Sequence, residues 1–433
     1  MFKTRDEVIE WIYERGKNRM KLGLERMEYV MERLGAPQKK FPSIHIGGTN
    51  GKGSTTSFLR QILQEAGYTV GTFTSPYFER FEDRICVNGE PIPSEDLVAC
   101  ANDIKPIIDE LADHPLGYPT PFEVITILGF YYFGQIRPVD IVLVEVGLGG
   151  RFDSTNVIEP LLTIITNIGH DHLHILGSTL AEIAYEKAGI IKTNTPLITA
   201  VKDEEAKEVL VSESKKNQAP IYMLTNDFSF TDLGELANGE TFSFTSSLAT
   251  FAKLRLGMLG KHQMENASLA IMAALLLREK FAWHIGEEAI RKGVEKAKWP
   301  GRFEIVSGNP LVIIDGAHNK EGMETLVDTL ERHYPQRRGT ILFSCLKDKP
   351  VDQIMPILDS LPDDLVFTEF NFFRVEKAEN LYKLSRKVNK EIALDWQGYL
   401  RRKLSGMRRG EMMVITGSLY FISLVKPFIR GIL

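Results

Sequence analysis

The spacing of apolar residues along the chain predicts helices that alternate with strands. Short apolar runs occupy residues 43–46, 68–73, 139–146 and 161–168, and a longer helical pattern covers 260–280. The run VDIVLVEV at 139–146 is apolar at almost every position, which is typical of a central parallel strand covered on both faces. The alternation therefore predicts an α/β fold with a doubly wound, mostly parallel sheet, whose ligands bind at the carboxyl ends of the strands.

Changes in this pattern predict two domains. The first 35 residues have helical spacing, and residues 226–251 carry short alternating segments that predict an antiparallel excursion. Trp299-Pro300-Gly301 is the strongest boundary, because proline and glycine separate two α/β patterns there. Further apolar runs follow at 311–314, 339–343, 364–368 and 412–415. We expect a larger domain over 1–298 and a smaller, Rossmann-like α/β domain over 299–433.

Composition excludes several classes of protein. Of 433 residues, 43% are hydrophobic and 25% charged, which excludes a disordered or fibrous chain. The net charge of -5 argues against a dedicated nucleic-acid binder. Three cysteines outside any CxxC motif argue against disulfides and a cysteine zinc site. With neither a signal peptide nor a membrane span in its pattern, the chain is expected to be cytoplasmic and without a membrane partner. No segment resembles a dedicated oligomerisation element, so we expect a monomer.

A glycine-rich segment, GGTNGKGST at residues 47–55, joins the first predicted strand to a helix. Glycines allow backbone N–H groups to surround phosphate oxygens at the positive end of a helix, and Lys52 would reach the outer phosphates. The standard P-loop spacing is not met, because its first glycine falls on Ile46 and its hydroxyl position on Gly53. The strand–loop–helix context still favours nucleotide binding over a glycine-rich turn with a surface lysine.

Glu145 ends the most apolar predicted strand, within the segment EVGLGGRFDSTN. A buried carboxylate is costly unless it meets a cation, so a magnesium ligand is the natural explanation. A strand-end glutamate that caps a turn is the alternative. The GLGG run is not a dinucleotide fingerprint, because the third glycine of GxGxxG would fall on Phe152.

Two later segments add candidate polar groups. IGHDHLH at 168–174 holds three of the nine histidines, and their spacing suits zinc as readily as magnesium. We expect one of the three to touch metal, and hydrogen-bonded structural histidines are the alternative. In AEIAYEKAGIIK, Lys187 precedes apolar residues, so we expect it to be partly buried and functional rather than part of a solvated face.

In the second predicted domain, DGAHN at 315–319 directly follows a strand, where α/β domains build their sites. Arg302 lies just past the boundary and would bring a guanidinium to developing phosphate charge as the domains close. A structural salt bridge of Arg302 is equally compatible with its position. Together the residues predict magnesium–nucleotide phosphoryl chemistry in a cleft between two domains, and they leave the acceptor open.

The chain resembles the ATP-dependent Mur-type amide ligases, and among them the folylpolyglutamate synthase/dihydrofolate synthase branch. Nine motifs carry the resemblance, in order from residue 45 to 421: HIGGTNGKGST, TSPYF with RFEDRI, EVGLGGRFDSTN, GHDHLHILG, EKAGIIK, GKHQMENA, WPGRFE, DGAHN and TGSLYF. The resemblance implies that ATP phosphorylates a carboxylate and that the amine of glutamate attacks the acyl phosphate, giving an amide, ADP and phosphate. Phosphate leaves readily because magnesium and lysine offset its charge.

The resemblance also implies roles for individual residues, with ATP and Mg²⁺ as cofactors and folate and L-glutamate as substrates. The catalytic residues would be Lys52, Lys187 and His318, with Lys187 matching a lysine that is carbamylated in the family. ATP would contact Thr49, Asn50, Gly51, Lys52, Gly53, Ser54, Asn266, Arg302 and Asp315. Magnesium would be held by Ser54, Ser75, Glu145 and His172. The substrates would contact Phe122, Glu123, Arg151, Phe152 and Asp153 on the folate side, and Ser418 and Tyr420 on the glutamate side.

One departure concerns the acceptor. Relatives with strong dihydrofolate synthase activity can carry an acidic residue where this chain has Lys21-Leu22-Gly23. The resemblance therefore implies glutamate addition to tetrahydrofolate or its polyglutamates and leaves dihydropteroate an open second acceptor.

Two alternatives to this function are disfavoured. Cell-wall Mur ligases place a substrate domain ahead of the P-loop, whereas 46 residues precede Gly47 here. A catalytically inactive nucleotide-binding relative has no reason to retain Lys52, Glu145, His172 and Lys187 together.

Overall fold

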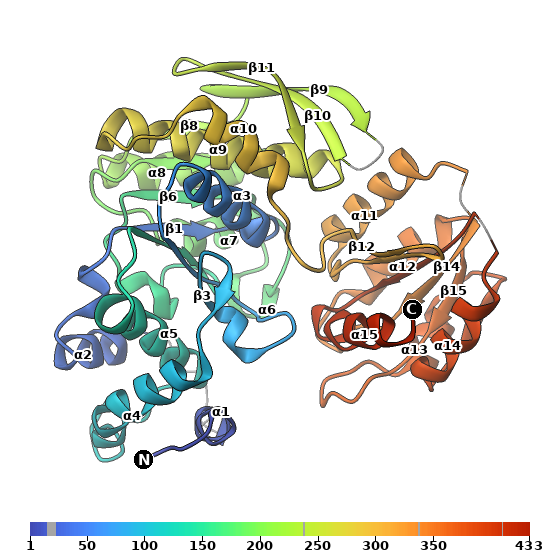
Figure 1. The fold of residues 1–433 in the computed structure, drawn as a ribbon, viewed down its shortest axis with the longest axis horizontal. Helices are drawn as coiled ribbons and strands as arrows, with labels where there is room; N and C mark the ends of the chain where they lie inside the picture. Colours follow the sequence, from blue (N-terminus) through green and yellow to red (C-terminus); the bar gives the residue numbers. More distant parts are fainter. Residues whose placement is uncertain (15–22, 237–238, 337, 409) are drawn as a thin grey trace. The chain divides into compact units, whose positions relative to one another are not determined.

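The computed structural model describes residues 1–433 except 15–22, 237–238, 337 and 409, and it divides into two compact units (Figure 1). Lys21 and Leu22 lie outside the described residues. Unit 1 comprises Met1–Thr231, Phe242–Arg255 and Glu265–Ala297. Unit 2 comprises Asp232–Thr241, Leu256–Met264 and Lys298–Leu433.

Unit 1 is built on an eight-stranded sheet with the order β4-β3-β2-β5-β1-β6-β7-β8. Neighbouring strands from β2 to β8 in this order run parallel, and β3 and β4 are added antiparallel at one edge. The strands are β1 Ser43–Gly47, β2 Val70–Phe73, β3 Ile85–Val87, β4 Glu90–Pro91, β5 Ile141–Glu145, β6 Leu162–Ile165, β7 Leu197–Thr199 and β8 Ile221–Met223. This order confirms the doubly wound, mostly parallel sheet that the apolar runs predicted.

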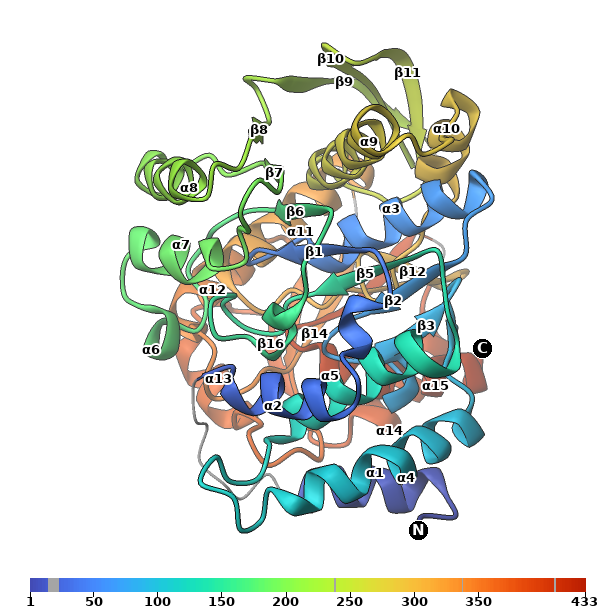
Figure 2. The ribbon, with the colours of Figure 1, turned by 90° about the vertical axis from the view of Figure 1, so that its left-hand side faces the viewer.

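Helices cover both faces of this sheet, with α3, α9 and α10 over one face and α2 and α5 over the other (Figures 1 and 2). All five residues of β5 are buried, which is why that run contains no alternation. The helices are α1 Arg5–Glu14, α2 Glu25–Arg33, α3 Lys52–Glu65, α4 Ser94–Glu110, α5 Pro121–Tyr131, α6 Leu173–Leu176, α7 Leu180–Ala188, α8 Glu204–Lys216, α9 Lys261–Phe281 and α10 Glu287–Lys296. Shorter helical turns are η2 Pro37–Lys39, η3 Phe81–Arg84, η4 Tyr132–Ile136 and η5 Ser154–Val157.

The segment predicted to leave the main sheet forms a separate three-stranded sheet in the order β11-β10-β9. Its strands are β9 Phe228–Leu236, β10 Gly239–Ser246 and β11 Thr250–Leu256. Buried and more exposed positions alternate along β9, as expected for a strand with one covered face. The residues of this sheet are divided between the two units.

Unit 2 contains a six-stranded sheet with the order β12-β13-β17-β14-β15-β16, parallel except for β12. The strands are β12 Glu304–Gly308, β13 Leu311–Ile314, β14 Arg338–Phe343, β15 Asp364–Phe367, β16 Lys390–Ile392 and β17 Glu411–Thr416. Its helices are α11 Lys320–His333, α12 Val351–Ser360, α13 Ala378–Leu384, α14 Trp396–Gly406 and α15 Leu419–Ile432. This arrangement confirms the predicted Rossmann-like α/β domain.

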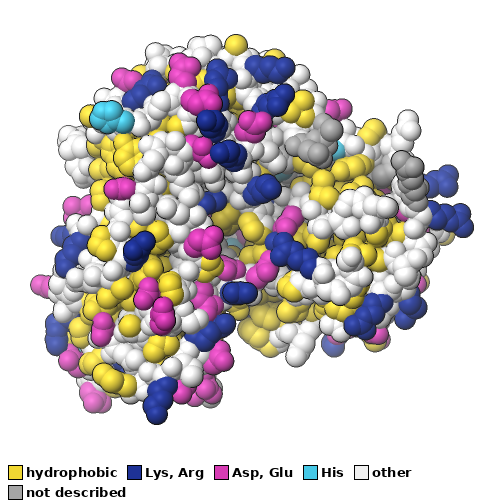
Figure 3. All heavy atoms as spheres, in the orientation of Figure 1, with side chains coloured by type: hydrophobic (Ala, Val, Ile, Leu, Met, Phe, Trp, Pro, Cys, Tyr) yellow, Lys and Arg dark blue, Asp and Glu magenta, His cyan; other side chains and the backbone are white. Residues whose placement is uncertain are grey.

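Within the part of the chain that the structure describes, no helix is both long and apolar enough to cross a bilayer. Basic and acidic side chains are interspersed over the face shown in Figure 3, as 52 basic and 57 acidic residues lead one to expect.

Candidate functional site

The glycine-rich loop of unit 1 connects the end of β1 to the start of α3, as predicted. Gly48 and Gly51 have φ angles of 135° and 86°, which disfavour any side chain. A Cβ atom at Gly48 would lie 1.9 Å from Thr166 Oγ1, and one at Gly51 would lie 2.3 Å from Asn266 Oδ1. The loop therefore requires glycine at both positions, and the Asn266 side chain lies against Gly51.

The segment after β6 braces this loop through Asn167, a residue that the sequence analysis missed. The backbone N–H of Thr49 donates to Asn167 O at 2.9 Å, and that of Asn50 donates to Asn167 Oδ1 at 2.8 Å. The Thr166 hydroxyl donates to Asn50 O at 2.6 Å. The sequence does contain a signal for this role, the polar pair Thr166-Asn167 at the carboxyl end of a strand. It was overlooked because the predicted apolar run extended to residue 168 and included both residues.

Two lysines converge on one carbonyl of the loop. Lys52 Nζ donates to Gly48 O at 3.1 Å and to Thr49 O at 3.2 Å, and Lys187 Nζ donates to Gly48 O at 3.0 Å. Burial, together with the charge of Lys52, lowers the pKa of Lys187 to about 7, against the opposing effect of Asp171 and Asp153. Lys187 is 4% exposed. Close to neutral pH, a substantial fraction of this amine is therefore uncharged and nucleophilic.

Glu145 is buried at the carboxyl end of β5, in register with Ile46 of β1. This register places the carboxylate-bearing residue at the strand ends where the glycine-rich loop begins. Parallel α/β sheets bind ligands at this edge.

Asp153, which was expected on the folate side, is buried and engaged by its own loop. It accepts hydrogen bonds from the backbone of Leu148 at 2.9 Å, from the backbone of Thr155 at 3.0 Å and from the Thr155 hydroxyl. Thr155 Oγ1 also lies 2.8 Å from His45 Nε2. Burial raises the pKa of Asp153 and lowers that of His45 to about 3, so the His45 ring is neutral at pH 7.

The residues proposed to hold metal have different surroundings. Ser54 is buried in the first turn of α3, and Ser75 is half-buried after β2. His172 is the N-cap residue directly before α6, with its side chain 36% exposed and its Nε2 3.7 Å from Asp171 Oδ2. Among the described residues, no three His, Cys, Asp or Glu side chains group as a metal site. Together these four side chains would offer an ion two hydroxyl oxygens, the Glu145 carboxylate and one imidazole nitrogen, and the oxygens among them are of the kind that magnesium prefers.

Most of the residues expected on the folate side already have partners within the protein. Glu123 caps α5 and pairs with Arg26, whose Nη2 lies 3.0 Å from Glu123 Oε1. Arg151 Nη2 lies 3.1 Å from Glu213 Oε2, and the guanidinium lies over the Tyr185 ring.

The aromatic residues of this group differ from one another. The Phe122 ring lies against Gly147, where an added Cβ atom would come within 2.5 Å of Phe122 Cζ. Phe152 is 46% exposed. The structure thus brings Phe122 next to the segment after β5 and leaves Phe152 at the surface of unit 1.

In unit 2, Asp315 and Ser418 follow the adjacent strands β13 and β17, in which Ile314 and Ile415 are paired in register. The buried Asp315 carboxylate accepts hydrogen bonds from the N–H groups of Phe303 and Ala317, both at 2.7 Å. Burial raises the pKa of Asp315, while the charge of Arg302 opposes that rise. The fold thus places Asp315 at the carboxyl edge of the sheet, next to the loop that begins α15.

The other predicted residues of unit 2 surround this edge. A Cβ atom at Gly316 would lie 2.6 Å from Arg302 Nη1, so the guanidinium lies against that glycine. His318 Nδ1 is 2.7 Å from Gly316 O. Tyr420 stacks on Phe372 with ring centroids 4.7 Å apart. His262, which the sequence analysis did not single out, also lies close enough to interact with Arg302. Burial and the charge of Arg302 lower the pKa of His262 to about 4.

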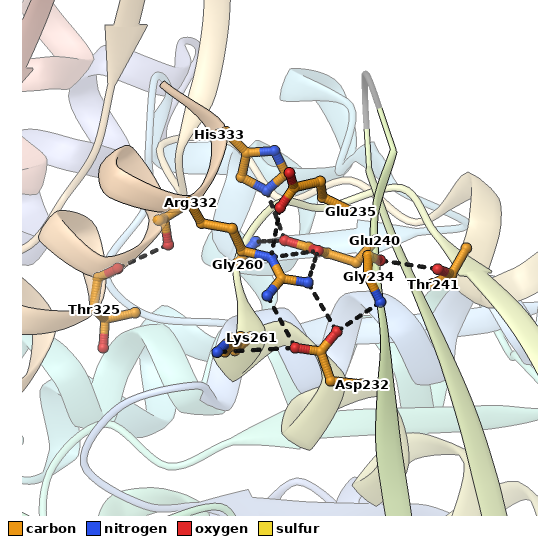
Figure 4. A network of polar contacts seen from close by, with 11 residues as sticks. Asp232, Gly234, Glu235, Glu240, Thr241, Gly260, Lys261, Thr325, Arg332 and His333 are labelled. Atoms are coloured by element: carbon orange, nitrogen blue, oxygen red, sulfur yellow. Dashed lines mark hydrogen bonds and ion pairs between the residues drawn. The ribbon is translucent and has the colours of Figure 1, made fainter. Parts of the chain in front are cut away.

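A polar network within unit 2 also escaped the sequence analysis (Figure 4). Glu240 is completely buried, accepts from Gly260 N at 2.8 Å and from Arg332 Nε at 3.0 Å, and lies 2.7 Å from His333 Nε2. Arg332 also makes two hydrogen bonds to Asp232, at 2.8 and 2.9 Å. Burial alone would raise the pKa of Glu240, but His333, Gly260 and Arg332 hold it below its usual value.

Comparison with known proteins defines the class first. Residues 130–274 match the Mur ligase middle domain, and residues 301–419 match the Mur ligase, glutamate ligase domain. A P-loop domain followed by a Rossmann-like domain with these matches is a Mur ligase.

Relatives then narrow the family. The chain is 45% identical over 430 residues to the dihydrofolate synthase/folylpolyglutamate synthase of Bacillus subtilis, covering 99% of this chain and 100% of that protein. The folylpolyglutamate synthase of Mycobacterium tuberculosis, solved with ADP, is similar with a TM-score of 0.90 at 29% identity over 98% of this chain and 97% of that one. A solved FPGS–AMPPCP–folate complex is similar with a TM-score of 0.84 at 30% identity, over 99% and 100% of the two chains. The chain belongs to the folylpolyglutamate synthase/dihydrofolate synthase family of Mur ligases, which confirms the resemblance that its motifs carried.

Proposed function

We propose that this chain is an ATP-dependent ligase that adds L-glutamate to folates, with tetrahydrofolate or its polyglutamates as acceptor and dihydropteroate as a second acceptor to be tested. The convergence of Lys52 and Lys187 on Gly48, in a loop that only glycine can form, is the observation that carries the proposal. Membership of a family with relatives solved with ADP, or with AMPPCP and folate, supports the choice of ATP and folate.

The proposed reaction has two displacement steps. A carboxylate oxygen of the folate attacks the γ-phosphorus of ATP, and ADP leaves with the electrons of the broken P–O bond. The amine of glutamate then attacks the acyl carbon, phosphate leaves, and the amine gives up a proton as the amide forms. Lys52 supplies positive charge for the outer phosphates, and the N–H groups of residues 51–54 at the start of α3 bind phosphate oxygens, since those of Thr49 and Asn50 already donate to Asn167.

Magnesium is proposed as the second cofactor. Ser54, Ser75, Glu145 and His172 would hold it, and when bound it neutralises phosphate charge. The position of Glu145 at the carboxyl end of β5 supports this role, since parallel α/β sheets bind their ligands at this edge.

Lys187 is proposed to act as a carbamate. Its pKa of about 7 provides the neutral amine that reacts with CO₂, forming an N–C bond and a carboxylate and releasing one proton to water. The change from a cation to an anion would also remove the repulsion between Lys187 and Lys52. We expect Lys187→Ala to be inactive and to be partly rescued by short-chain carboxylates. Failure of rescue would contradict carbamylation.

The remaining assignments are proposed on motif and position. Asn266 contacts ATP from unit 1, and Arg302, Asp315 and His318 act from the C-terminal domain, residues 299–433. Phe122, Glu123, Arg151, Phe152 and Asp153 serve the folate side, of which Glu123 and Arg151 act through their ion pairs with Arg26 and Glu213. Ser418 and Tyr420 serve the glutamate side. We further propose that the protein is a monomer located in the cytoplasm. Its three cysteines are buried free thiols, as expected for a protein in a reducing compartment.

The experiment is to supply tetrahydrofolate and dihydropteroate separately with ATP and glutamate and to identify the products by mass. We expect one or more added glutamyl units on tetrahydrofolate, with phosphate release that requires both folate and glutamate. Phosphate release without that requirement, or none at all, would contradict ligase function. Lys52→Ala should lose turnover, and near-normal turnover in that variant would refute the role of the loop.

A further inference from the structure

The turn that carries Arg302 is held by carboxylates on both sides. The N–H of Gly301 donates to Glu304 Oε2 at 2.9 Å, and the N–H of Phe303 donates to Asp315 Oδ2 at 2.7 Å. Gly301 O also accepts from the N–H of Gly316 at 2.9 Å, which ties the turn to the strand β13 edge. The backbone before and after Arg302 is therefore fixed independently of what the guanidinium itself contacts.

This turn needs such fixing because its backbone is strained. Phe303 has a φ angle of 40°, in the left-handed region that bulky residues avoid. Its ring is buried and stacks on Tyr334 with an interplanar angle of 16°. A residue stays in a strained conformation only when its surroundings determine it, and such positions concentrate at functional sites.

Lys426 provides the outer anchor. It lies on α15 with only 4% of its surface exposed, and its Nζ is 2.9 Å from Glu304 Oε1. Glu304 therefore accepts a hydrogen bond from the Gly301 N–H with Oε2 and forms an ion pair with Lys426 Nζ through Oε1. A carboxylate two residues from Arg302 would attract the guanidinium if its own charge were not already balanced. Lys426 supplies that balance, so Arg302 keeps its place beside Gly316 and Asp315.

We infer that Glu304 and Lys426 are positioning residues for Arg302 in the use of ATP. The inference rests on the proposed function, because it requires that Arg302 contacts the nucleotide. Neither residue touches the substrate in this account. They act by holding the turn and by keeping Arg302 from pairing with Glu304.

The test is a double-mutant cycle read out by ATP kinetics and by calorimetric AMPPCP binding. We expect Lys426→Met to raise the KM for ATP and the Kd for AMPPCP about tenfold, as for loss of one well-placed charged contact, with the KM for glutamate unchanged. Lys426→Arg should restore most of the affinity. In the Arg302→Ala background, Lys426→Met should have no further effect, because the residue it positions is gone.

The matched control is Lys377→Met, which breaks a more exposed ion pair of unit 2, Lys377 Nζ to Glu369 Oε2 at 2.8 Å. It should leave both constants unchanged. If Lys426→Met does not fold, the double variant Glu304→Leu/Lys426→Met replaces it. This variant leaves no unpaired charge, removes the acceptor for the Gly301 N–H that holds the turn, and should raise the KM for ATP and the Kd for AMPPCP in the same way.

Additive effects in the cycle, or an equal rise in the KM for glutamate, would overturn the inference alone. Unchanged ATP constants in Arg302→Ala would overturn the proposed role of Arg302, and this inference with it.

Discussion

Replacing Lys187 with methionine should stabilise the protein at neutral pH while abolishing its activity. Lys187 is buried beside a second cation, and its pKa falls from 10.5 to about 7 on folding. A lysine whose pKa is lower in the folded state destabilises that state, and the full penalty applies at pH values below the folded pKa. The penalty fades as pH rises toward the unfolded value. Methionine has a similar length and carries no charge, so Lys187→Met removes the penalty.

The magnitude follows from the two pKa values. At pH 7 the penalty is about 4 kcal/mol, and at pH 10 it has fallen to about 1 kcal/mol. Methionine also loses the hydrogen bond to Gly48 O, worth about 1–2 kcal/mol at either pH, although Lys52 still donates to that oxygen. We therefore expect the variant to be more stable by about 2–3 kcal/mol at pH 7 and nearly equal to wild type at pH 10.

The assay is urea unfolding of both proteins at pH 7 and pH 10 in CO₂-free buffer, so that Lys187 stays unmodified. Lys202→Met, which replaces a side chain that is 70% exposed, is the control and should show no pH-dependent difference. A Lys187→Met variant that is less stable than wild type at pH 7, or a difference that does not change with pH, would refute the reasoning.

Three further predictions concern the loop and the network. Gly48→Ala should lose ATP binding and about 2 kcal/mol or more of stability, since the added Cβ would clash with Thr166. The control is Gly67→Ala, because Gly67 also has a positive φ angle but has open space where the Cβ would lie. It should cost about 1 kcal/mol of stability and keep ATP binding. Asn167→Ala should raise the Kd for AMPPCP with a loss of about 1 kcal/mol; an unchanged Kd would show that the brace is dispensable. Arg332→Met should lower the free energy of unfolding by about 3 kcal/mol at pH 7. Because the pKa of Glu240 is lowered from 4.5 in the fold, the contribution of the ion pair is lost as pH falls below 4.5 and through the lowered pKa, so the difference should shrink in acid. A difference that stays constant into acid would contradict this.

The features that local pattern and motif carry could be predicted from the sequence. The β5 run is apolar up to Glu145 because both faces are buried, and the glycine-rich loop is recognisable because it must join a strand to a helix. Asp315 was placed at a strand end by the same reasoning, and the structure sets its strand β13 beside β17, which precedes Ser418.

Other features depend on contacts between distant parts of the chain, which no local pattern encodes. Lys187 reaches Gly48 across 139 residues, and Arg26 pairs with Glu123 across 97. The pairing of Glu240 with Arg332 spans 92 residues. In each case a charged residue that reads as part of a solvated face is buried, because tertiary packing supplies its partner. Lys187 was expected to be partly buried from its apolar neighbours, but the carbonyl that it meets could not be predicted.

The most direct test of the central claim follows an oxygen atom. If the folate carboxylate is activated by phosphoryl transfer, one of its oxygens must leave with the phosphate. Tetrahydrofolate labelled with ¹⁸O in the reacting carboxylate, supplied with ATP and glutamate, should give inorganic phosphate carrying one labelled oxygen for each amide formed. Unlabelled phosphate accompanying amide formation would contradict the acyl phosphate and, with it, the proposed mechanism.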